Sequence, residues 1–422
     1  MKKQMNRVLA LVLAGVMTAG LAGCGGGSSS TTTAAPAAAT TAAPAAAAPA
    51  ASTEAAPAAA EQPKADAGVQ AKADEIHIGM VNPLSGDNAL YGLDQERGMT
   101  LAFEEINAAG GVNGAKLVLD EYDDQGDPQN AAKGAQKFAD DDSIAAMVGS
   151  SLTSCTLAIV PIIDDAGLVE CVVSSSSPSL ANCSPYFFRM AVQDVQAARQ
   201  MAKAVLDQDK KKISVLYANN DFGQKLAESL VDYAKENGGE IIDYIDYNPA
   251  DQDFTAILTT VKSSAPEAVC LCGTVTDCAL LIKQMRNLGI DALVMGHTSL
   301  YSDKALEIAG EAMEGVDCVS VYIASNPDPK VQELVKKFED KFGQAPDSFA
   351  AMAYDMAYVL AAAADRAMQA EDGEVTRDGM QAGMKQTDYD GVTGHVYFTD
   401  ENEWERDYLT LTVKDGAFVV LE

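Results

Sequence analysis

Short apolar runs alternate along the chain, from Glu75 onward, with longer segments in which apolar residues recur every three or four positions. The short runs predict strands buried on both faces, and the longer segments predict amphipathic helices. Asp127 and Pro128 suit the N-cap and the first position of one such helix. The first repeats predict strands at 75–81, 115–124, 144–150 and 169–175, and helices at 92–111, 127–141 and 153–167.

The same alternation continues toward the C-terminus and predicts a second group of elements. Strands are predicted at 211–218, 240–247, 267–273, 292–297 and 315–323, with strand patterns returning at 391–400 and 407–422. Helices are predicted at 194–208, 222–239, 254–265, 277–289, 302–310, 329–343 and 348–369. Strands that alternate with helices indicate parallel sheets covered on both faces, and these units are too many for one small sheet. We therefore predict the α/β fold class, with two doubly wound parallel-sheet lobes.

The N-terminus follows a different pattern. Three basic residues within the first seven precede an apolar run at 8–18, which has the length of a signal peptide and is too short to span a bilayer. The sequence Leu-Ala-Gly-Cys that ends at Cys24 resembles the lipobox of bacterial lipoproteins, in which the cysteine is diacylated and the peptide is cut before it. The resemblance implies a signal peptide at 1–23 and lipidation of Cys24. An ordinary signal peptide with an incidental cysteine is the alternative.

Residues 24–74 are dominated by Ala, Pro, Thr, Ser and Gly and carry almost no side chain that could build a core. Recurrent prolines disfavour a helix and favour extended segments, so we predict a disordered tether. No other apolar run reaches transmembrane length. The expected location is therefore extracytoplasmic, with the protein held on the bacterial cell membrane by the lipid alone.

Charge and cysteine content narrow the classes of partner. The formal net charge is −31, and removal of three basic residues with the signal peptide takes it to −34. So acidic a chain argues against binding nucleic acid through a basic face. Seven cysteines follow Cys24, an odd number without zinc spacing, and we expect most to be small buried apolar residues. A disulfide between Cys171 and Cys183 remains possible.

Signatures of enzymes do not occur in the sequence. The chain lacks the glycine-rich fingerprint of dinucleotide sites, the phosphate-binding loop, the HExxH zinc motif and the GxSxG nucleophile elbow. The three histidines, His77, His297 and His395, have no recognisable partner spacing. We therefore expect a binding protein rather than an enzyme, with no cofactor and no metal.

Hydroxyl-bearing residues gather at three predicted strand ends, in 81–92, 148–155 and 172–180. Ligands of open α/β sheets bind outside the carboxyl ends of the strands, where a helix N-terminus also offers free N–H groups. Ser and Thr donors suit a carboxylate better than a phosphate, for which a glycine-rich loop would be expected. For any single residue, helix capping explains the hydroxyl equally well.

Several of these stretches resemble the substrate-binding proteins of ABC importers, in the family of leucine/isoleucine/valine-binding proteins. The resemblance is carried by "IHIGMVNPLSGDNALYG", "AFEEINAAGGVNGAKLVLDEYDDQGDP", "SSSSPSL" and "NNDFGQKLAESL", and it runs in order through 75–422. It implies a type I periplasmic-binding-protein fold, with three crossovers between the lobes and the ligand held between them. Lobe 1 would comprise 75–193 and 323–398, and lobe 2 would comprise 194–322 and 399–422. The implied protein is a monomer that delivers its ligand to an ABC permease.

The resemblance also carries a set of ligand contacts over to this chain, position by position. Thr153, with Ser154 beside it, takes the position whose hydroxyl and amide meet the ligand carboxylate. Ser174 and Ser176 match a second pair of contacts, one through the main chain and one through the side chain. Two aromatic walls and an acidic partner for the α-ammonium complete the set: Tyr91, Phe222 and Asp194.

Two positions depart from the family pattern. Amino-acid binders place a Tyr where this chain has Thr274, and a Glu where it has Thr298, just after His297. Losing that Glu removes a main partner of the ammonium, and burying an ammonium without a counter-charge is unfavourable. Either Asp194 takes over, alone or with Asp277, or the ligand is not an α-amino acid. An aliphatic amino acid is the first expectation, an amide or a carboxylate without an ammonium is the alternative, and a ligand sensor for a membrane signalling protein is a rival function.

The lipobox yields a direct test. Because lipidation needs the thiol, Cys24→Ala should either release the protein from membranes or leave an uncleaved precursor. Membrane fractionation with immunoblotting measures both. A variant that is processed and membrane-bound like the parent would show that Cys24 is not the anchor.

Overall fold

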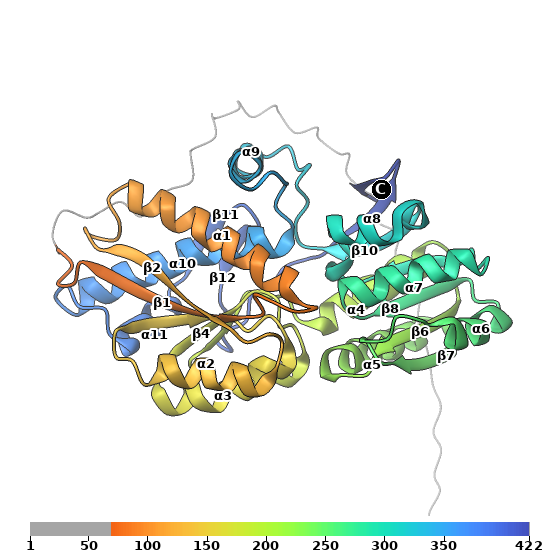
Figure 1. Cartoon of the computed structure of the whole chain (residues 1–422), viewed down its shortest axis with the longest axis horizontal. Coiled ribbons are helices and arrows are strands. Elements are labelled where there is room, and N and C mark those ends of the chain that lie inside the picture. The colour runs from red at the N-terminus through yellow and green to blue at the C-terminus, as the bar shows by residue number, and fades with distance from the viewer. Residues whose placement is uncertain (1–68, 422) are drawn as a thin grey trace, which may run out of the picture. The chain divides into compact units, whose positions relative to one another are not determined.

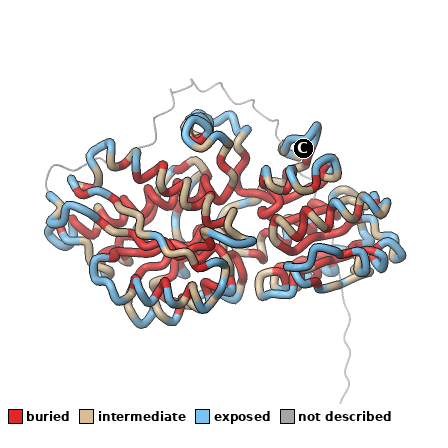
Figure 2. Tube along the Cα trace, viewed as in Figure 1, coloured by how far each residue is buried: buried red, intermediate tan, exposed pale blue. Residues whose placement is uncertain are grey.

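The computed structural model describes residues 69–421, so the predicted signal peptide, Cys24 and most of the predicted tether lie outside the described residues. Within this range the chain forms two α/β lobes (Figure 1). Buried residues follow the strands of both sheets and the inner faces of the helices that cover them (Figure 2). None of the described helices combines the length and the apolar character that crossing a bilayer requires.

The first lobe is built on a fully parallel sheet of five strands in the order β2-β1-β3-β4-β5. The strands are β1 (Glu75–Asn82), β2 (Lys116–Asp123), β3 (Ile144–Val148), β4 (Val169–Val172) and β5 (Phe187–Arg189). Its helices are α1 (Ala89–Ala108), α2 (Pro128–Ala139), α3 (Thr153–Ala166), α10 (Ser348–Ala370) and α11 (Arg377–Met384). Helices α2 and α3 pack together, and α1 packs on α10. The chain thus returns from far along the sequence to cover its first sheet.

The second lobe contains a sheet of seven strands in the order β14-β13-β10-β9-β8-β6-β7. Five are parallel, and two at one edge are antiparallel. The parallel strands are β6 (Lys212–Ala218), β7 (Glu240–Tyr247), β8 (Ala268–Cys272), β9 (Leu293–Gly296) and β10 (Val316–Ser320), and the antiparallel pair is β13 (Leu409–Lys414) and β14 (Ala417–Val420). The helices are α4 (Asp194–Asp207), α5 (Asp221–Glu236), α6 (Thr255–Ser264), α7 (Val275–Asn287) and α8 (Asp303–Ala309).

The remaining described elements are short or lie outside the two sheets. They are α9 (Pro329–Phe342), the hairpin β11 (Asp388–Gly391) and β12 (Gly394–Tyr397), and the 3-10 turns η1 (Pro178–Leu180), η2 (Thr298–Leu300) and η3 (Gly310–Met313). The predicted fold class, two doubly wound α/β lobes, is confirmed. Asp127 caps α2 as predicted, because its carboxylate accepts hydrogen bonds from the backbone N–H of Gln129 and Asn130.

The packing of α1 on α10 depends on a small residue. A Cβ atom at Gly98 would lie 2.2 Å from the backbone oxygen of Ala350, so glycine permits the close approach of the two helices. Tyr354 and Tyr358 of α10 both donate hydrogen bonds to Glu105 of α1, at 2.9 and 3.0 Å. These contacts fix α10 against the first sheet.

A buried ion pair lies where the chain passes for the last time from the first lobe to the second, between β12 and β13. The guanidinium of Arg189 is fully buried and donates two hydrogen bonds of 2.6 Å to Glu403 and one of 2.6 Å to the backbone oxygen of Ser177. The backbone of Arg189 also bonds to Asn402 and Trp404, both at 2.9–3.0 Å. We placed the return of the chain to the second lobe at residue 399. These contacts keep the chain on the first lobe as far as Trp404, and the second lobe resumes with β13.

The start of the folded part also lies earlier than we placed it. The backbone N–H of Ala71 donates to Asn113, and that of Lys72 donates to Gly373, at 3.2 and 2.9 Å. Val69 and Ala71 pack against the core of the first lobe. Residues 69–74, which we assigned to the tether, are thus part of the lobe surface, because their backbone finds partners there.

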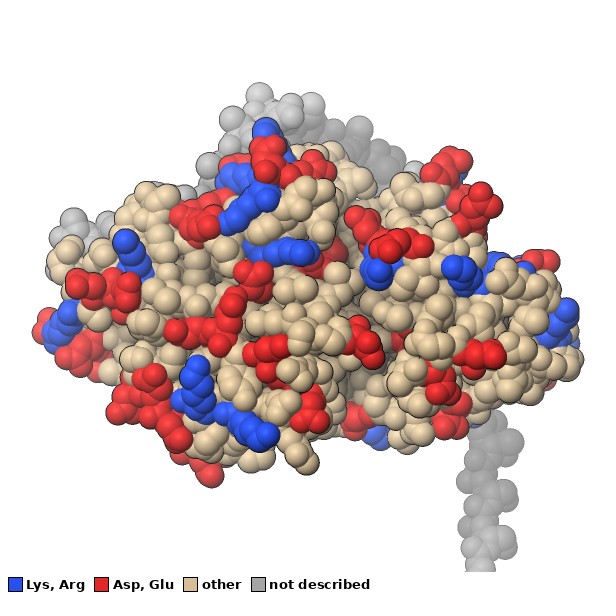
Figure 3. Space-filling view, in the orientation of Figure 1, with Lys and Arg blue, Asp and Glu red and all other residues tan. Residues whose placement is uncertain are grey.

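The prediction that most cysteines are buried is confirmed. All seven cysteines among the described residues are free, and all but Cys183 are buried. The disulfide that was possible between Cys171 and Cys183 is therefore not formed. On the face drawn in Figure 3, acidic side chains are scattered over both lobes and basic ones lie among them.

Glu170 is the least expected residue of the first core. It lies on β4 between β3 and β5, is fully buried, and neither carboxylate oxygen has a hydrogen-bond partner. Burial raises its pKa well above the usual value of 4.5, because a charge there would be separated from water. The folded protein therefore holds a proton on Glu170 that the unfolded chain releases above about pH 4.5.

This proton makes stability depend on pH. Because the native state binds more protons than the unfolded state, the contribution of Glu170 to the free energy of unfolding falls as pH rises above about 4.5. Glu170→Met should remove this dependence and raise the free energy of unfolding at neutral pH by about 1–3 kcal/mol. Denaturant titrations at pH 5 and pH 8 measure both effects. The exposed Glu240→Met is the matched control, and a Glu170→Met protein no more stable than the parent would contradict the argument.

Candidate functional site

A cavity of about 300 Å³ lies at the carboxyl ends of strands from both lobes. The first lobe contributes polar side chains and two aromatic rings: Asp87, Asn88, Tyr91, Ser151, Leu152, Thr153, Ser154, Ser174 and Phe349. The second lobe contributes Asn220, Asp221, Phe222, Pro249, Ala250, Gln252, Thr274, Thr276, His297 and Ser299. This position is the crevice where open α/β sheets bind ligands, and the volume suits a small molecule.

A buried hydrogen-bond network shapes the first-lobe side of the cavity. The side-chain amide of Gln95 donates to the hydroxyls of Ser151 and Ser174, each at 2.9 Å. Ser174 Oγ donates in turn to the backbone oxygen of Ser151, and Ser151 Oγ donates to Asn82. Since the hydroxyl hydrogen of Ser174 is used inside the protein, a donation from Ser174 to a ligand has to come from its backbone N–H.

The N-terminus of α3 opens at the cavity. Thr153 is the first residue of this 14-residue helix, and Leu152 stands at the N-cap without a polar side chain. Such a helix start leaves backbone N–H groups without a side-chain cap and carries the positive end of the helix dipole. Thr153 and Ser154 both line the cavity there, so this end suits a carboxylate.

Aromatic rings form the apolar walls. Tyr91 and Phe349 pack edge to face with ring centroids 5.3 Å apart, and Phe222 packs in the same way against His297 at 5.3 Å. The hydroxyl of Tyr91 accepts a hydrogen bond of 2.9 Å from the backbone N–H of Val275 in the second lobe. Tyr91 therefore joins the lobes as well as lining the cavity.

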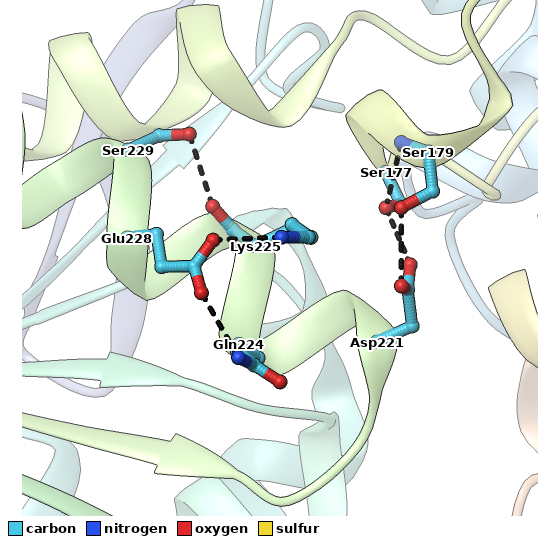
Figure 4. A network of polar contacts seen from close by, with 7 residues as sticks. All are labelled: Ser177, Ser179, Asp221, Gln224, Lys225, Glu228 and Ser229. Atoms are coloured by element: carbon cyan, nitrogen blue, oxygen red, sulfur yellow. Dashed lines mark hydrogen bonds and ion pairs between the residues drawn. The ribbon is translucent and has the colours of Figure 1, made fainter. Parts of the chain in front are cut away.

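A second link between the lobes lies at the cavity rim (Figure 4). Ser177 and Ser179, which follow β4, donate hydrogen bonds of 2.7 and 3.0 Å to the two carboxylate oxygens of Asp221 at the start of α5. Lys225 and Glu228 pair with each other further along the same helix. These two hydrogen bonds join the lobes, and we call the contact of Ser177 and Ser179 with Asp221 the Asp221 latch.

Thr274 and Asp277 are committed to a helix cap. Asp277 accepts hydrogen bonds from the backbone N–H and the hydroxyl of Thr274, which together form a capping box at the start of α7. It also accepts a bond of 2.5 Å from the hydroxyl of Tyr247. Thr274 lines the cavity, whereas Asp277 does not. Because the Asp277 carboxylate already accepts these three hydrogen bonds, we do not assign it to the ligand ammonium.

Three of the predicted contacts lie behind the cavity wall. Six of the nine predicted residues line the cavity: Tyr91, Thr153, Ser154, Ser174, Phe222 and Thr274. Ser176, Asp194 and Thr298 are buried and do not line it. His297, which we did not predict as a ligand contact, lines the cavity, and its Nε2 lies 3.5 Å from Asp194 Oδ1.

Burial controls the charge of this pair. Burial raises the pKa of Asp194 to about 7, although the charge of Arg189 opposes the shift. Burial lowers the pKa of His297 to about 4, so its imidazole is neutral at physiological pH.

Sequence reasoning missed several lining residues for identifiable reasons. Phe349 comes from the start of α10, far along the chain from Tyr91, and no local pattern links the two. Asn220 and Asp221 follow β6, and His297 follows β9, so the rule that ligands bind at strand ends could have found them.

Comparisons with known proteins agree with this geometry. A sequence model described as periplasmic binding protein matches residues 75–417. The chain belongs to the periplasmic binding protein family. Its structure is similar to a family member, the branched-chain amino acid transporter substrate binding protein LivJ from Streptococcus pneumoniae, solved with isoleucine. The TM-score is 0.76 at 25% identity, over 82% of this chain and 99% of that one.

Two further similar proteins differ in what they bind. A leucine-, isoleucine-, valine-, threonine- and alanine-binding protein of Pseudomonas aeruginosa is 28% identical over 353 residues, or 81% of this chain and 93% of the relative. A solute-binding protein of an ABC transporter from R. palustris, solved with benzoate, has a TM-score of 0.76 at 22% identity, over 82% of this chain and 95% of that one. The second likeness shows the shared fold alone.

The latch at Asp221 gives a structural prediction. Replacing both donors, in Ser177→Ala/Ser179→Ala, removes two hydrogen bonds between the lobes and should move the lobes apart. Small-angle scattering should then give a larger radius of gyration than for the parent. Ser229→Ala, which removes a hydroxyl bonded only within α5, is the matched control. Equal radii for the three proteins would mean that the latch does not hold the lobes together.

Proposed function

We propose that this protein is the extracytoplasmic solute-binding component of an ABC importer, which captures a small amino acid between its lobes and delivers it to the permease. The observation that carries the proposal is the cavity between the two lobes, with polar donors on one side and aromatic walls on the other. A ligand in contact with both lobes favours the form in which they are together. The permease would recognise that form.

The first-lobe side of the cavity supports a carboxylate as one end of the ligand. The uncapped start of α3 and the hydroxyls of Thr153 and Ser154 supply donors and a favourable dipole. Two of the similar proteins named above take amino acids, and every amino acid carries this group. The walls formed by Tyr91, Phe222 and Phe349 favour an aliphatic side chain as the first choice.

Few acidic side chains at the cavity could bind the ammonium of an amino acid. Among the described lining residues, Asp221 is held by two serines and Asp87 is exposed, so neither is a buried partner for an ammonium. Asp194 is the acidic group behind the wall, and its carboxylate oxygens have no hydrogen-bond partner. We therefore propose Asp194 as the counter-charge of the ammonium. An amide, or a carboxylate without an ammonium, is the alternative ligand that this shortage of acidic partners favours.

The N-terminal features complete the proposal. A lipid on Cys24 would hold the protein at the outer face of the cell membrane, beside its permease, and a tether would give the lobes reach. No assembly is needed for function, because one chain supplies both sides of the cavity. We propose that the protein acts as a monomer.

Calorimetry with two matched ligands tests the proposal. L-leucine and 4-methylpentanoate share a carboxylate and an aliphatic chain and differ in the ammonium. The removal of a charged hydrogen-bond partner costs about 1.5–3 kcal/mol, so Asp194→Asn should weaken leucine at least about tenfold. It should barely change the binding of 4-methylpentanoate. Equal losses for both ligands would mean that Asp194 only supports the crossover, and no binding of any L-amino acid by the parent protein would overturn the amino-acid proposal.

A further inference from the structure

Unpartnered polar atoms are concentrated behind one wall of the cavity. Among the described residues, twelve buried side-chain nitrogen and oxygen atoms have no hydrogen-bond partner. Six of the twelve belong to four residues, which we call the inner polar cluster: Ser176, Asp194, His297 and Thr298. Buried polar groups are nearly always paired in native proteins, so such a concentration indicates a missing partner.

The cluster is assembled from three separate parts of the chain. Ser176 follows β4, Asp194 begins α4, and His297 and Thr298 follow β9. The backbone N–H of Asp194 donates to the backbone oxygen of Ser176 at 3.0 Å, which holds these two residues together. Of the four residues, only His297 lines the cavity, and its Nε2 lies 3.5 Å from the Asp194 carboxylate.

The Asp194 carboxylate has no dedicated counter-charge. Arg189 favours its charged form, but that guanidinium is already bonded to Glu403 and to the Ser177 backbone. His297 is at 3.5 Å, the outer limit of a hydrogen bond, and is neutral at physiological pH because burial lowers its pKa to about 4. A fully buried carboxylate in such surroundings binds a proton readily.

The other titratable groups around Asp194 do not supply the missing positive charge. Asp221 of α5 is negative and favours the protonated form of Asp194. Cys272 of β8 and Tyr408, ahead of β13, both have pKa values raised by burial and stay neutral. A cation at this place therefore has to come from the ligand.

We propose that His297 and Asp194 together form the subsite for the ligand's cationic group, and that the cation enters by replacing one proton held by this pair. The proposal rests on the proposed function, because it takes the ligand to be an amino acid. Neutral imidazole accepts a hydrogen bond with one nitrogen and donates with the other. His297 can thus accept from the ammonium while donating to the newly charged Asp194. The ammonium keeps its charge, Asp194 loses its proton to solvent, and the total charge is conserved.

His297 then acts as the specificity-determining residue of the site. An amino acid gains from a charged Asp194, whereas a carboxylate without an ammonium binds best while Asp194 is still protonated. The two ligand classes should therefore respond to pH in opposite directions. A residue with only a packing role would not produce this difference.

The first experiment is calorimetry on the purified full-length chain at pH 6 and pH 8. Since burial places the pKa of Asp194 near 7, L-leucine should bind about tenfold more tightly at pH 8 than at pH 6. For 4-methylpentanoate the affinity should be unchanged or lower at pH 8. The leucine difference should vanish in Asp194→Asn. A leucine affinity that does not change with pH in the parent, or one that still changes in Asp194→Asn, would overturn the inference and leave the proposed function standing.

Variants of His297 test whether its imidazole nitrogens take part in binding. His297→Phe keeps a ring against Phe222 but removes both nitrogens, so leucine should bind at least about tenfold more weakly at pH 8 and its pH response should move to higher pH. His297→Gln restores a donor and an acceptor and should recover most of the affinity. His395→Phe, on the exposed hairpin strand β12, is the control that should change neither. A His297→Phe protein with the parent's pH response would overturn the role of His297.

A measurement without ligand keeps the inference testable if leucine does not bind at all. The chain has three histidines, so the His297 imidazole can be assigned by NMR with the His297→Gln variant. Its nitrogen shifts should stay those of a neutral ring and change slightly with a midpoint near pH 7 as Asp194 titrates. That change should be absent in Asp194→Asn. A ring that becomes charged near its ordinary value, or that does not respond to Asp194, would overturn the pair.

Discussion

The buried pair of Arg189 and Glu403 fixes the place where this chain passes between its lobes. Two hydrogen bonds of 2.6 Å join the side chains, and a third ties Arg189 to the backbone of Ser177. Removing one partner from a buried pair costs about 3–5 kcal/mol, although a well-packed apolar replacement can be neutral. The main effect of this ion pair is therefore to fix the position of the loop that it contacts, more than to stabilise the fold. It sets the loop that bears Ser176, Ser177 and Ser179, on which both the inner polar cluster and the Asp221 latch depend.

The site combines two needs that conflict. Its first-lobe side satisfies its polar groups internally, through Gln95, Ser151 and Ser174, and so is rigid before a ligand arrives. Its other side leaves the buried side chains of Asp194 and His297 without hydrogen-bond partners. An unpaired buried group is unfavourable in the empty protein, but a ligand that satisfies it gains more than it would from a solvated partner. Selectivity in such a site comes from what the protein leaves unsatisfied.

The sequence predicted most of the architecture because hydrophobic periodicity is a local property. Nearly every strand and long helix lies within a few residues of its predicted place, but α11 and β5 are short and carry no clear period, so they were missed as separate elements. For the site, residues directly after strands were found where they bear hydroxyls, whereas His297 was dismissed for want of a partner nearby in sequence. Its partner, Asp194, lies about a hundred residues earlier. Phe349 was missed for the same reason, since only the folded chain brings α10 to the cavity.

The long return of α10 onto α1 has a consequence for how the protein comes to be folded. The apolar side of α1 is covered by a helix that begins some 240 residues later in the chain, after the whole parallel part of the second lobe. In a chain that leaves a ribosome or a membrane pore N-terminus first, the first lobe cannot close its core while α10 is still inside. The second lobe's parallel strands emerge together and can pair first. The first lobe is thus synthesised first but folds completely only after α10 has emerged. Until then its apolar α1 face is exposed and needs protection from aggregation.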